Sequence, residues 1–491
     1  MALNKQKQPG FVDRVVKLIS SKRFFLCIIA ITVLQGLWYA VSFSGWINDE
    51  PKHFRTTEIY TQQLSPFFTH QPASWDNAAD VIREGSYLFY YLMSWPLRLL
   101  QLVTPNHHLQ LIGLRLIMIA VFVLGLVFYR RAMLATKKMS PALVHTALLL
   151  FVLTPAAGLL AGMLNYDNLV FLLFGMLLYW TMQVLTAPEV KARLLIAIVI
   201  VAELSALVKW SSIALVLPLL VFIAYDQVSR FGRKWMQLFV KGLRRLPTAI
   251  VLLLTLGFLI ATAAIIERPV QNMLVYGKPE PSCDAVLSRE RCLKNTDYYN
   301  YSQTLAHKDP HFTPLSLPAY VIRFWAPYMA DKSANLIEQG AATRLPIVTA
   351  LFLAAAAISP LLLLVRWRQI AQHRVLSLLA FIIIFYAAVL ILQEYGVYTK
   401  YGIPGAIRTR YLVPVLVPYL CLVLYCLWPF ARKFRSAAIG VLIISLILLL
   451  QGGSIVTHLF TTPRHVYLSP TSYQLNHTLK QALDPVVYGN Q

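Results

Sequence analysis

The sequence is short of charged residues, and it is especially short of acidic ones. Charged side chains make up only 13% of the 491 residues, and hydrophobic residues make up 58%, whereas about a quarter of a typical soluble domain is charged. This composition excludes a water-soluble enzyme and a disordered chain. With only five cysteines, the chain is also not a small secreted domain held together by disulfides. The mean hydropathy of +0.60 instead indicates a protein of the membrane.

Long apolar runs, by contrast, are abundant. Eleven segments have about the length that a helix needs to cross a bilayer. They are 24–46, 110–129, 142–161, 168–187, 194–208, 211–225, 246–266, 345–365, 375–393, 411–430 and 436–459. We therefore predict an all-α polytopic membrane protein with about eleven transmembrane helices. The fifth and sixth segments are short, and we expect them to form a hairpin that turns at Lys209. Residues 86–105 are also apolar, but Pro96 and Arg98 interrupt them, so we expect them to lie on the outer face of the membrane.

The scarcity of acidic residues leaves a large positive net charge. The chain has 44 basic and 21 acidic residues, for a net charge of +23, which on its own would be compatible with nucleic-acid binding. If the N-terminus is cytoplasmic, however, the inner segments hold 24 basic and three acidic residues, and the outer segments hold 18 and 17. Basic residues concentrate on the cytoplasmic side of membrane proteins. The charge is therefore a sign of topology, and we expect the lipid bilayer, and no nucleic acid, as a partner.

The loops differ between the two sides of the membrane. The inner loops are short and basic, whereas the outer loops 47–109 and 267–344 are long, and a third outer loop spans 394–410. We predict one transmembrane domain, 1–459, whose outer loops form the active-site face. A short extracytoplasmic tail, 460–491, follows. Chemistry or recognition is therefore expected outside the cytoplasm.

A cluster of charged residues directly follows the first span. Asp49 and Glu50 are adjacent, His53 and Glu58 follow them, and Pro51 is suited to the first position of a helix. A carboxylate at this helix start could act as the general base for an acceptor hydroxyl. The alternative is an aspartate that caps the helix beside solvent-exposed charges.

A second acidic residue lies in the short turn between the third and fourth spans. Asp167 follows Asn165 there, and the simplest function of either residue is to cap a helix. Asp49 and Asp167 are nevertheless expected at the same depth and on the same side of the membrane. In such a pair, one carboxylate could act as the general base while the other orients it. Alternatively, the pair could bind a divalent metal together with His53.

Cations form the third element of the expected site. Arg115 is at the outer end of the second span, Lys209 is at the hairpin turn, and Arg408 and Arg410 precede Tyr411 at the start of the tenth span. Cations at membrane depth are costly to keep dry and often bind an anion, of which phosphate is the obvious one. Arginine suits bidentate contact with phosphate, whereas lysine acts as a point charge. The alternatives are side chains that extend to the membrane surface and ion pairs with acidic residues of the same chain.

Other chemical motifs are few. Cys283 and Cys292 share the outer loop 267–344, where an oxidising environment would let them form a disulfide; the sequence alone leaves this open. No Walker motif, dinucleotide-binding glycine fingerprint or zinc-protease motif occurs in a supporting context.

The order of these patterns resembles that of a known superfamily, the GT-C membrane glycosyltransferases, which take sugars from polyprenyl-phosphate carriers. Residues 48–55 resemble its acidic first-loop motif and are especially similar to the Asp-Glu-Pro-x-His-Phe signature of a group of bacterial membrane proteins. Residues 165–168 are similar to its second acidic motif. Lys209 and residues 408–414 look like its donor-side lysine and its late Arg-Tyr-x-x-Pro motif. Protein O-mannosyltransferases and lipid A aminoarabinose transferases share this layout.

The resemblance implies a GT-C-like fold and an inverting transfer of a hexose or pentose on the outer face of a bacterial inner membrane. The expected partners are a polyprenyl-phosphate-linked sugar and a glycan, glycolipid or protein acceptor. Asp49 would be the base, with Glu50 and Asp167 as further catalytic residues. The donor phosphate would be bound by Lys209, Arg408, Arg410, Tyr411 and Arg115, with supporting roles for His53, Glu58 and Asn165. No cofactor is certain, and a divalent metal, if one takes part, would be held by Asp49, His53 and Asp167.

Two other functions fit the same composition. An O-antigen polymerase or ligase would use a polyprenyl diphosphate donor, but that class usually relies on outer-loop arginine and histidine rather than on paired acids. A flippase or transporter of lipid-linked sugars would place its ionisable groups within the spans and often shows repeated halves. The ionisable residues of this chain concentrate at the outer membrane boundary, which favours the glycosyltransferase.

Overall fold

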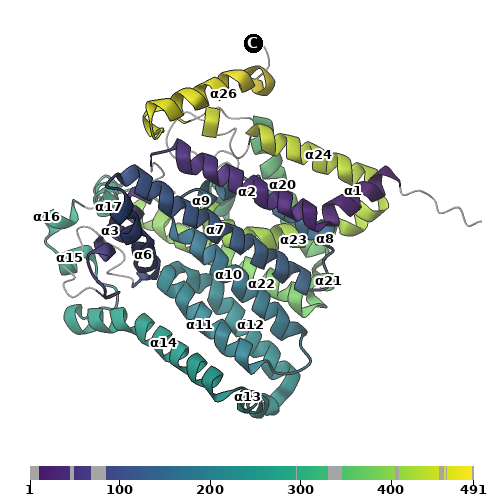
Figure 1. Ribbon diagram of the computed structural model, residues 1–491, viewed down its shortest axis with the longest axis horizontal. Helices are drawn as coiled ribbons and strands as arrows, with labels where there is room; N and C mark the ends of the chain where they lie inside the picture. The colour runs from purple at the N-terminus through teal and green to yellow at the C-terminus, as the bar shows by residue number, and fades with distance from the viewer. Residues whose placement is uncertain are drawn as a thin grey trace, which may run out of the picture.

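The computed structural model describes residues 10–44, 49–67, 85–294, 296–329, 346–403, 409–452, 458–460 and 462–488. These residues are almost entirely helical (Figure 1). Across these ranges the only β-type pairing is an isolated antiparallel bridge between Phe43 and Tyr467. The fold class is therefore all-α, as the sequence predicts.

The long helices coincide with ten of the expected spans. They are α2 (Lys22–Ser42), α7 (His107–Ala135), α10 (Tyr166–Thr186), α11 (Ala192–Val208), α12 (Ile213–Phe231), α14 (Thr248–Tyr276), α20 (Pro346–Val365), α22 (Arg374–Tyr401), α23 (Val413–Lys433) and α24 (Arg435–Gly452). However, α14 and α22 extend into the predicted outer loops 267–344 and 394–410. Shorter helices include α1 (Phe11–Ser20), α3 (Glu50–Thr61), α6 (Leu88–Val103), α8 (Pro141–Val152), α9 (Pro155–Ala161), α13 (Trp235–Arg244), α15 (Cys283–Val286), α16 (Arg289–Cys292), α17 (Thr296–Ala306), α18 (Leu317–Tyr320), α21 (Trp367–Ala371) and α26 (Pro470–Tyr488). Two 3₁₀ turns, η1 (Trp210–Ser212) and η4 (Thr409–Leu412), precede α12 and α23.

Seven helical segments of the described chain are long and apolar enough to cross a membrane. They begin at Lys22, His107, Tyr166, Trp210, Thr248, Arg374 and Arg410. The expected span 142–161 is divided instead: α8 ends at Val152, and α9 begins at Pro155 because proline has no N–H to continue the preceding helix. The number of eleven spans and the cytoplasmic N-terminus stay predictions.

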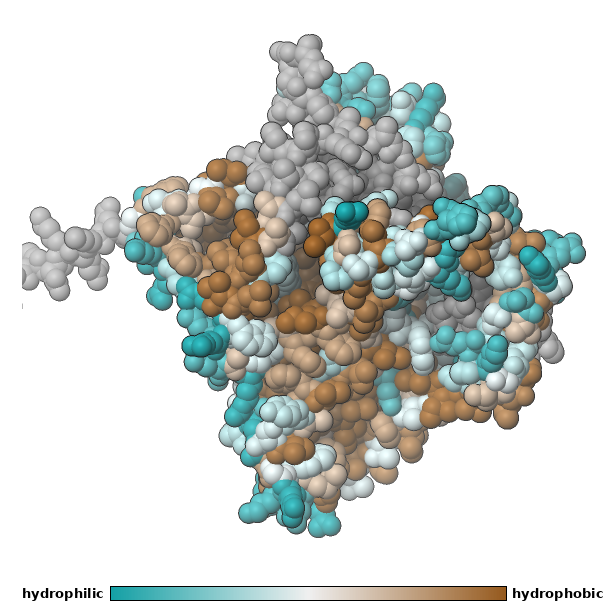
Figure 2. All heavy atoms as spheres, turned by 180° about the vertical axis from the view of Figure 1, so that it is seen from behind, coloured by the Kyte–Doolittle hydropathy of each residue, from teal (hydrophilic) through white to brown (hydrophobic). Residues whose placement is uncertain are grey.

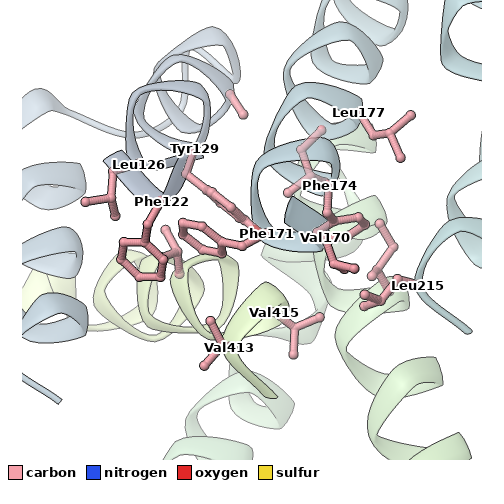
Figure 3. Close-up of a cluster of buried hydrophobic side chains, with 14 of the residues drawn as sticks. Phe122, Leu126, Tyr129, Val170, Phe171, Phe174, Leu177, Leu215, Val413 and Val415 are labelled. Carbon is pink, nitrogen blue, oxygen red and sulfur yellow. The ribbon is translucent and has the colours of Figure 1, made fainter. Parts of the chain in front are cut away.

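The core forms where α7 packs against α10. A Cβ atom on Gly125 would lie 2.5 Å from Cδ1 of Phe171, so glycine is what lets the two helices approach. The ring of Phe171 stacks on Phe122 and Tyr129, with centroids 4.7 and 4.5 Å away (Figure 3). The hydroxyl of Tyr129 donates a hydrogen bond to the carbonyl of Pro414 at 2.6 Å, which fixes α23 to the same core.

The surface of the molecule is itself largely apolar. Figure 2 shows a broad hydrophobic area on one face, with hydrophilic side chains gathered at its margins. Only 6% of the most apolar stretch of α14 is buried inside the protein. Large contiguous apolar surfaces are rare on soluble monomers. Such a helix is suited to contact with lipid. The chain is a polytopic membrane protein.

The outer loops also contain ordered structure. The expected interfacial segment forms α6, which packs against α3 and α7, and Arg98 of α6 donates a hydrogen bond to the carbonyl of Tyr60 in α3 at 2.9 Å. In the loop 267–344, Cys283 and Cys292 form the disulfide that the sequence left open.

The C-terminal tail folds back onto the end of α2. The backbone N–H of Leu468 donates to the carbonyl of Ser42 at 2.9 Å, and Nε1 of Trp38 donates to Oδ1 of Asn476 in α26 at 2.8 Å. Figure 1 shows α26 beyond this end of α2. The tail thus contacts the end of the helix that precedes Asp49 in the chain.

Candidate active site

Asp49 immediately precedes α3, whose first turn contains Pro51. Proline is favoured there because the first turn needs no intrahelical partner for its nitrogen. The side chain of Asp49 does not cap this helix. Instead, its Oδ2 accepts a hydrogen bond from Nη2 of Arg410, 361 residues later in the chain. The Asp49 side chain is 26% exposed, so the start of α3 is tied to η4 while part of the carboxylate stays accessible.

Asp167 lies in the first turn of α10 and binds Lys209. Oδ1 of Asn165 caps the helix by accepting a hydrogen bond from the backbone N–H of Asp167 at 2.8 Å. Nζ of Lys209, at the end of α11, lies 2.6 Å from Oδ1 of Asp167, and both side chains are nearly buried. The same ammonium group is 4.6 Å from the ring centroids of Tyr166 and Tyr411. Lys209 is thus held by an ion pair and two cation–π contacts.

Arg410 connects the two acids. In addition to its contact with Asp49, its Nε lies 3.9 Å from Oδ2 of Asp167. Asp49, Asp167, Lys209 and Arg410 therefore form one network of two negative and two positive charges, contributed by four separate segments. Balance matters here because a buried charge without a partner is costly. Within the described chain, Oδ2 of Asp167 and Nε of Arg410 face each other at 3.9 Å and have no hydrogen-bond partner.

Glu50 points away from this network and pairs with Arg115. Nε and Nη2 of Arg115 donate to the two carboxylate oxygens of Glu50 at 2.9 and 2.6 Å. Nη1 of Arg115 donates to the carbonyls of Ala40 and Phe43 at 2.8 and 2.6 Å, and the backbone N–H of Leu164 donates to Glu50 at 2.8 Å. Both charged side chains are almost completely buried. The pair joins the end of α2, the start of α3 and the turn before α10 to α7.

His53, one turn into α3, is buried beside the network. Its Nδ1 lies 2.8 Å from the hydroxyl of Tyr90, and its ring packs edge-on against Tyr166 at a centroid distance of 4.7 Å. Burial lowers the pKa of His53 from 6.5 to about 3; the Asp49 carboxylate opposes this shift, and the Arg410 guanidinium adds to it. The imidazole is therefore neutral at physiological pH. Within the described residues its Nε2 has no hydrogen-bond partner.

The remaining expected residues have different surroundings. Oε1 of Glu58 lies 3.2 Å from Nδ1 of the exposed His107. Tyr411 contributes its ring to Lys209. Arg408 lies outside the described residues.

The expected metal ligands do not form a metal site. The described part of the chain contains no group of three histidine, cysteine, aspartate or glutamate side chains that could hold a metal ion. Asp49 and Asp167 are paired with cations instead, and His53 binds Tyr90. The residues present therefore do not fit a divalent metal.

The sequence did not single out most of the aromatic side chains of the site. Tyr166 directly precedes Asp167 in the first turn of α10. Its position beside a candidate acid could have indicated that it belongs to the site. Tyr90 reaches the site from α6, and the hydroxyl of Tyr386 in α22 donates to the carbonyl of Tyr411 at 2.8 Å. These last two have no local signal, because only the tertiary fold brings them to the site.

Comparison with known proteins finds solved structures with a related arrangement of helices. No model of a protein family matches the chain, and no curated protein matches it. It is similar to the crystal structure of ArnT from Cupriavidus metallidurans in the apo state, with 15% identity and a TM-score of 0.43, over 85% of this chain and 62% of that one. The structure of the same ArnT bound to undecaprenyl phosphate matches with 16% identity and a TM-score of 0.46, over 97% of this chain and 71% of that one. In the first match the chain spans less than two thirds of the length of ArnT.

Proposed function

We propose that the protein is an integral-membrane glycosyltransferase. It transfers a sugar from a polyprenyl-phosphate carrier to a hydroxyl group of a glycan, glycolipid or protein acceptor of the cell envelope, on the extracytoplasmic face of the inner membrane. The observation that carries the proposal is the balanced network of Asp49, Asp167, Lys209 and Arg410. It combines a proton acceptor and two cations in one nearly dry site at the ends of apolar helices.

The two cations suit the phosphate of a lipid-linked donor. A sugar joined to polyprenyl phosphate is a phosphodiester with one negative charge, and the departing phosphate gains a second. Cations positioned in advance in a dry site stabilise such developing charge, because little reorganisation is needed during the reaction. Lys209 is held between two tyrosine rings and Arg410 between two carboxylates. A lipid carrier also presents its phosphate at the membrane surface, where Lys209 ends α11 and Arg410 precedes α23.

Asp49 is the proposed general base. Arg410 covers one oxygen of its carboxylate, and a donor phosphate would compete for the same guanidinium group. That exchange frees Asp49 to accept the proton of the acceptor hydroxyl. The acceptor oxygen then attacks the anomeric carbon from the side opposite the phosphate. The bond from that carbon to the phosphate oxygen breaks, its electron pair leaves with the phosphate, and the product has inverted configuration.

Other residues of the site are assigned positioning roles. Asp167 orients Lys209 through their ion pair. Glu50 and Arg115 fix the backbone on both sides of Asp49, because Arg115 binds the carbonyl of Phe43 and the carboxylate that begins α3. In this proposal Arg115 therefore does not contact the donor, in contrast to the expectation from sequence.

The test is incubation of the purified full-length protein with a panel of polyprenyl-phosphate sugars and cell-envelope acceptors. Release of polyprenyl phosphate that depends on the acceptor supports the proposal. Release from polyprenyl diphosphate donors alone would favour a polymerase or ligase instead. Movement of intact donor across proteoliposomes, without release of its phosphate, would favour a flippase.

A further inference from the structure

A second cluster of charges lies at the far end of α12 from Lys209. A cavity of about 630 Å³ opens there, between α12 and the start of α22. Its walls include Phe222, Tyr225, Asp226, Ser229, Arg230 and Arg374. At about 1.5 Å per residue, the 19 residues of α12 rise about 28 Å, close to the thickness of the hydrocarbon core of a bilayer. The cavity therefore lies near the membrane surface opposite the candidate active site.

The cavity has a surplus of positive charge. Oδ2 of the buried Asp226 lies 3.2 Å from Nη1 of Arg230, and its Oδ1 lies 3.6 Å from Nε of Arg374. Arg230 also donates to the carbonyls of Val184 and Leu185 near the end of α10, so it belongs to the framework of the bundle. Arg374 is 57% exposed. Two arginines and one aspartate in the wall leave one positive charge, and an anion is the ligand that balances it.

An apolar stripe leads along α12 to this cavity. Leu217, Val221 and Tyr225 follow one another at intervals of four residues and are 48%, 52% and 69% exposed. On the neighbouring α22, Phe381 and Ile384 are exposed as well. Residues four apart share one face of a helix, so these three side chains of α12 form a stripe about 12 Å long. It ends at the arginines, which is the arrangement of an acyl chain joined to a charged headgroup.

We propose that this cavity binds the phosphate of an anionic phospholipid in the leaflet opposite the active site. The phosphate contacts Arg374 and the hydroxyl of Ser229, an exposed residue of the cavity wall, and the acyl chains lie along Leu217, Val221 and Tyr225. Basic pockets between transmembrane helices on the cytoplasmic side are suited to anionic headgroups. A free phosphate ion has the same charged group but no acyl chains to contact the apolar stripe. Binding of a phospholipid can therefore be distinguished from binding of inorganic phosphate.

The experiment measures thermal unfolding of the purified full-length protein in detergent, with phosphatidylglycerol, phosphatidylcholine or inorganic phosphate added. We expect phosphatidylglycerol to raise the midpoint and the other two to leave it unchanged. Native mass spectrometry of the same samples counts bound phosphatidylglycerol. In Arg374→Gln the bound fraction should fall about tenfold, as expected for the loss of one charge-assisted hydrogen bond.

Matched variants keep the test decisive. Arg435 is 52% exposed and pairs with Asp13 at 2.5 Å, so Arg435→Gln removes a similar surface cation and should bind phosphatidylglycerol like the wild type. Ser229→Asp places a negative charge at an exposed position of the cavity wall and should also lower the bound fraction at least tenfold, so the proposal can be tested even if Arg374→Gln fails to fold. Equal binding in wild type and Ser229→Asp would overturn the proposal. So would an equal effect of phosphatidylcholine or of inorganic phosphate.

Discussion

Nζ of Lys209 lies 2.6 Å from Oδ1 of Asp167, and the same ammonium group lies 4.6 Å from the ring centroids of Tyr166 and Tyr411. A lysine held on three sides loses little further conformational entropy when it binds a ligand, because folding has already ordered its side chain. Under the proposed function this fixed charge receives the donor phosphate, and Asp167 keeps it in place.

Replacement of Lys209 therefore tests donor binding. Lys209→Met should raise the KM for the donor about 10- to 100-fold, because a hydrogen bond between charged groups contributes about 1.5–3 kcal/mol. Initial rates at varied donor concentration measure the effect. Lys191→Met is the matched control, since Lys191 makes an ion pair of the same length with Glu189 on the exposed surface. An unchanged KM in Lys209→Met would remove this residue from the donor site.

The buried pair of Glu50 and Arg115 predicts a change in stability. Glu50→Gln should lower the free energy of unfolding by about 3–5 kcal/mol, because it leaves the Arg115 guanidinium buried without its counter-charge. The measurement is the midpoint of thermal unfolding in detergent. Asp13→Asn breaks an exposed pair with Arg435 and should have little effect. If Glu50→Gln unfolded like the wild type but lost activity, Glu50 would belong to the chemistry and not to the framework.

The buried His53 predicts a dependence of stability on pH. Its pKa is about 3 in the folded protein against 6.5 for the free side chain, so between these values the unfolded chain binds the proton more readily. The contribution of His53 to stability is thus full above pH 6.5 and is lost as the pH falls toward 3, by about 1.4 kcal/mol per pH unit within that window. His53→Asn should flatten the dependence, whereas His311→Asn, at an exposed position, should not. Identical pH curves for wild type and His53→Asn would contradict this account.

The packing of the tail predicts its side of the membrane. The tail contacts Ser42 and Trp38 at the end of α2, the end that precedes Asp49 in the chain. The tail and Asp49 therefore both belong to the extracytoplasmic face in the proposed topology. Alkaline phosphatase fused after Gln491 should therefore be active. An inactive phosphatase fusion, together with a fluorescent fusion at the same position that glows, would place the tail in the cytoplasm.

The sequence was sufficient to predict the helical fold, and its wider set of candidate residues included the four charges that the structure brings together. Each of these residues lies at the end of an apolar segment, and helices of similar length place their ends at similar depths. This argument needs no tertiary contacts, which is why it could select Asp167, Lys209 and Arg410 although they are distant in the sequence.

The pairing of the charges could not be predicted in the same way. Asp49 and Glu50 are adjacent, but neighbouring residues at a helix start point in different directions. One meets Arg410 and the other meets Arg115, and only the packing of α2, α3 and α7 decides which. The contact of Trp38 with Asn476 likewise joins residues 438 apart, and no local pattern indicates it.

The most direct test of the proposed function is the rate of polyprenyl phosphate release by Asp49→Asn. This variant keeps the size of the side chain and removes its ability to accept a proton, and loss of a general base typically slows a reaction by about 10² to 10⁴-fold. Asp13→Asn, which makes the same change at an exposed arginine pair, serves as the control. We predict that Asp49→Asn folds and binds polyprenyl phosphate at least as tightly as the wild type, because Arg410 loses its competing carboxylate, but releases it at least 100-fold more slowly during transfer. Transfer at the wild-type rate by folded Asp49→Asn would contradict the assignment of Asp49 as the base.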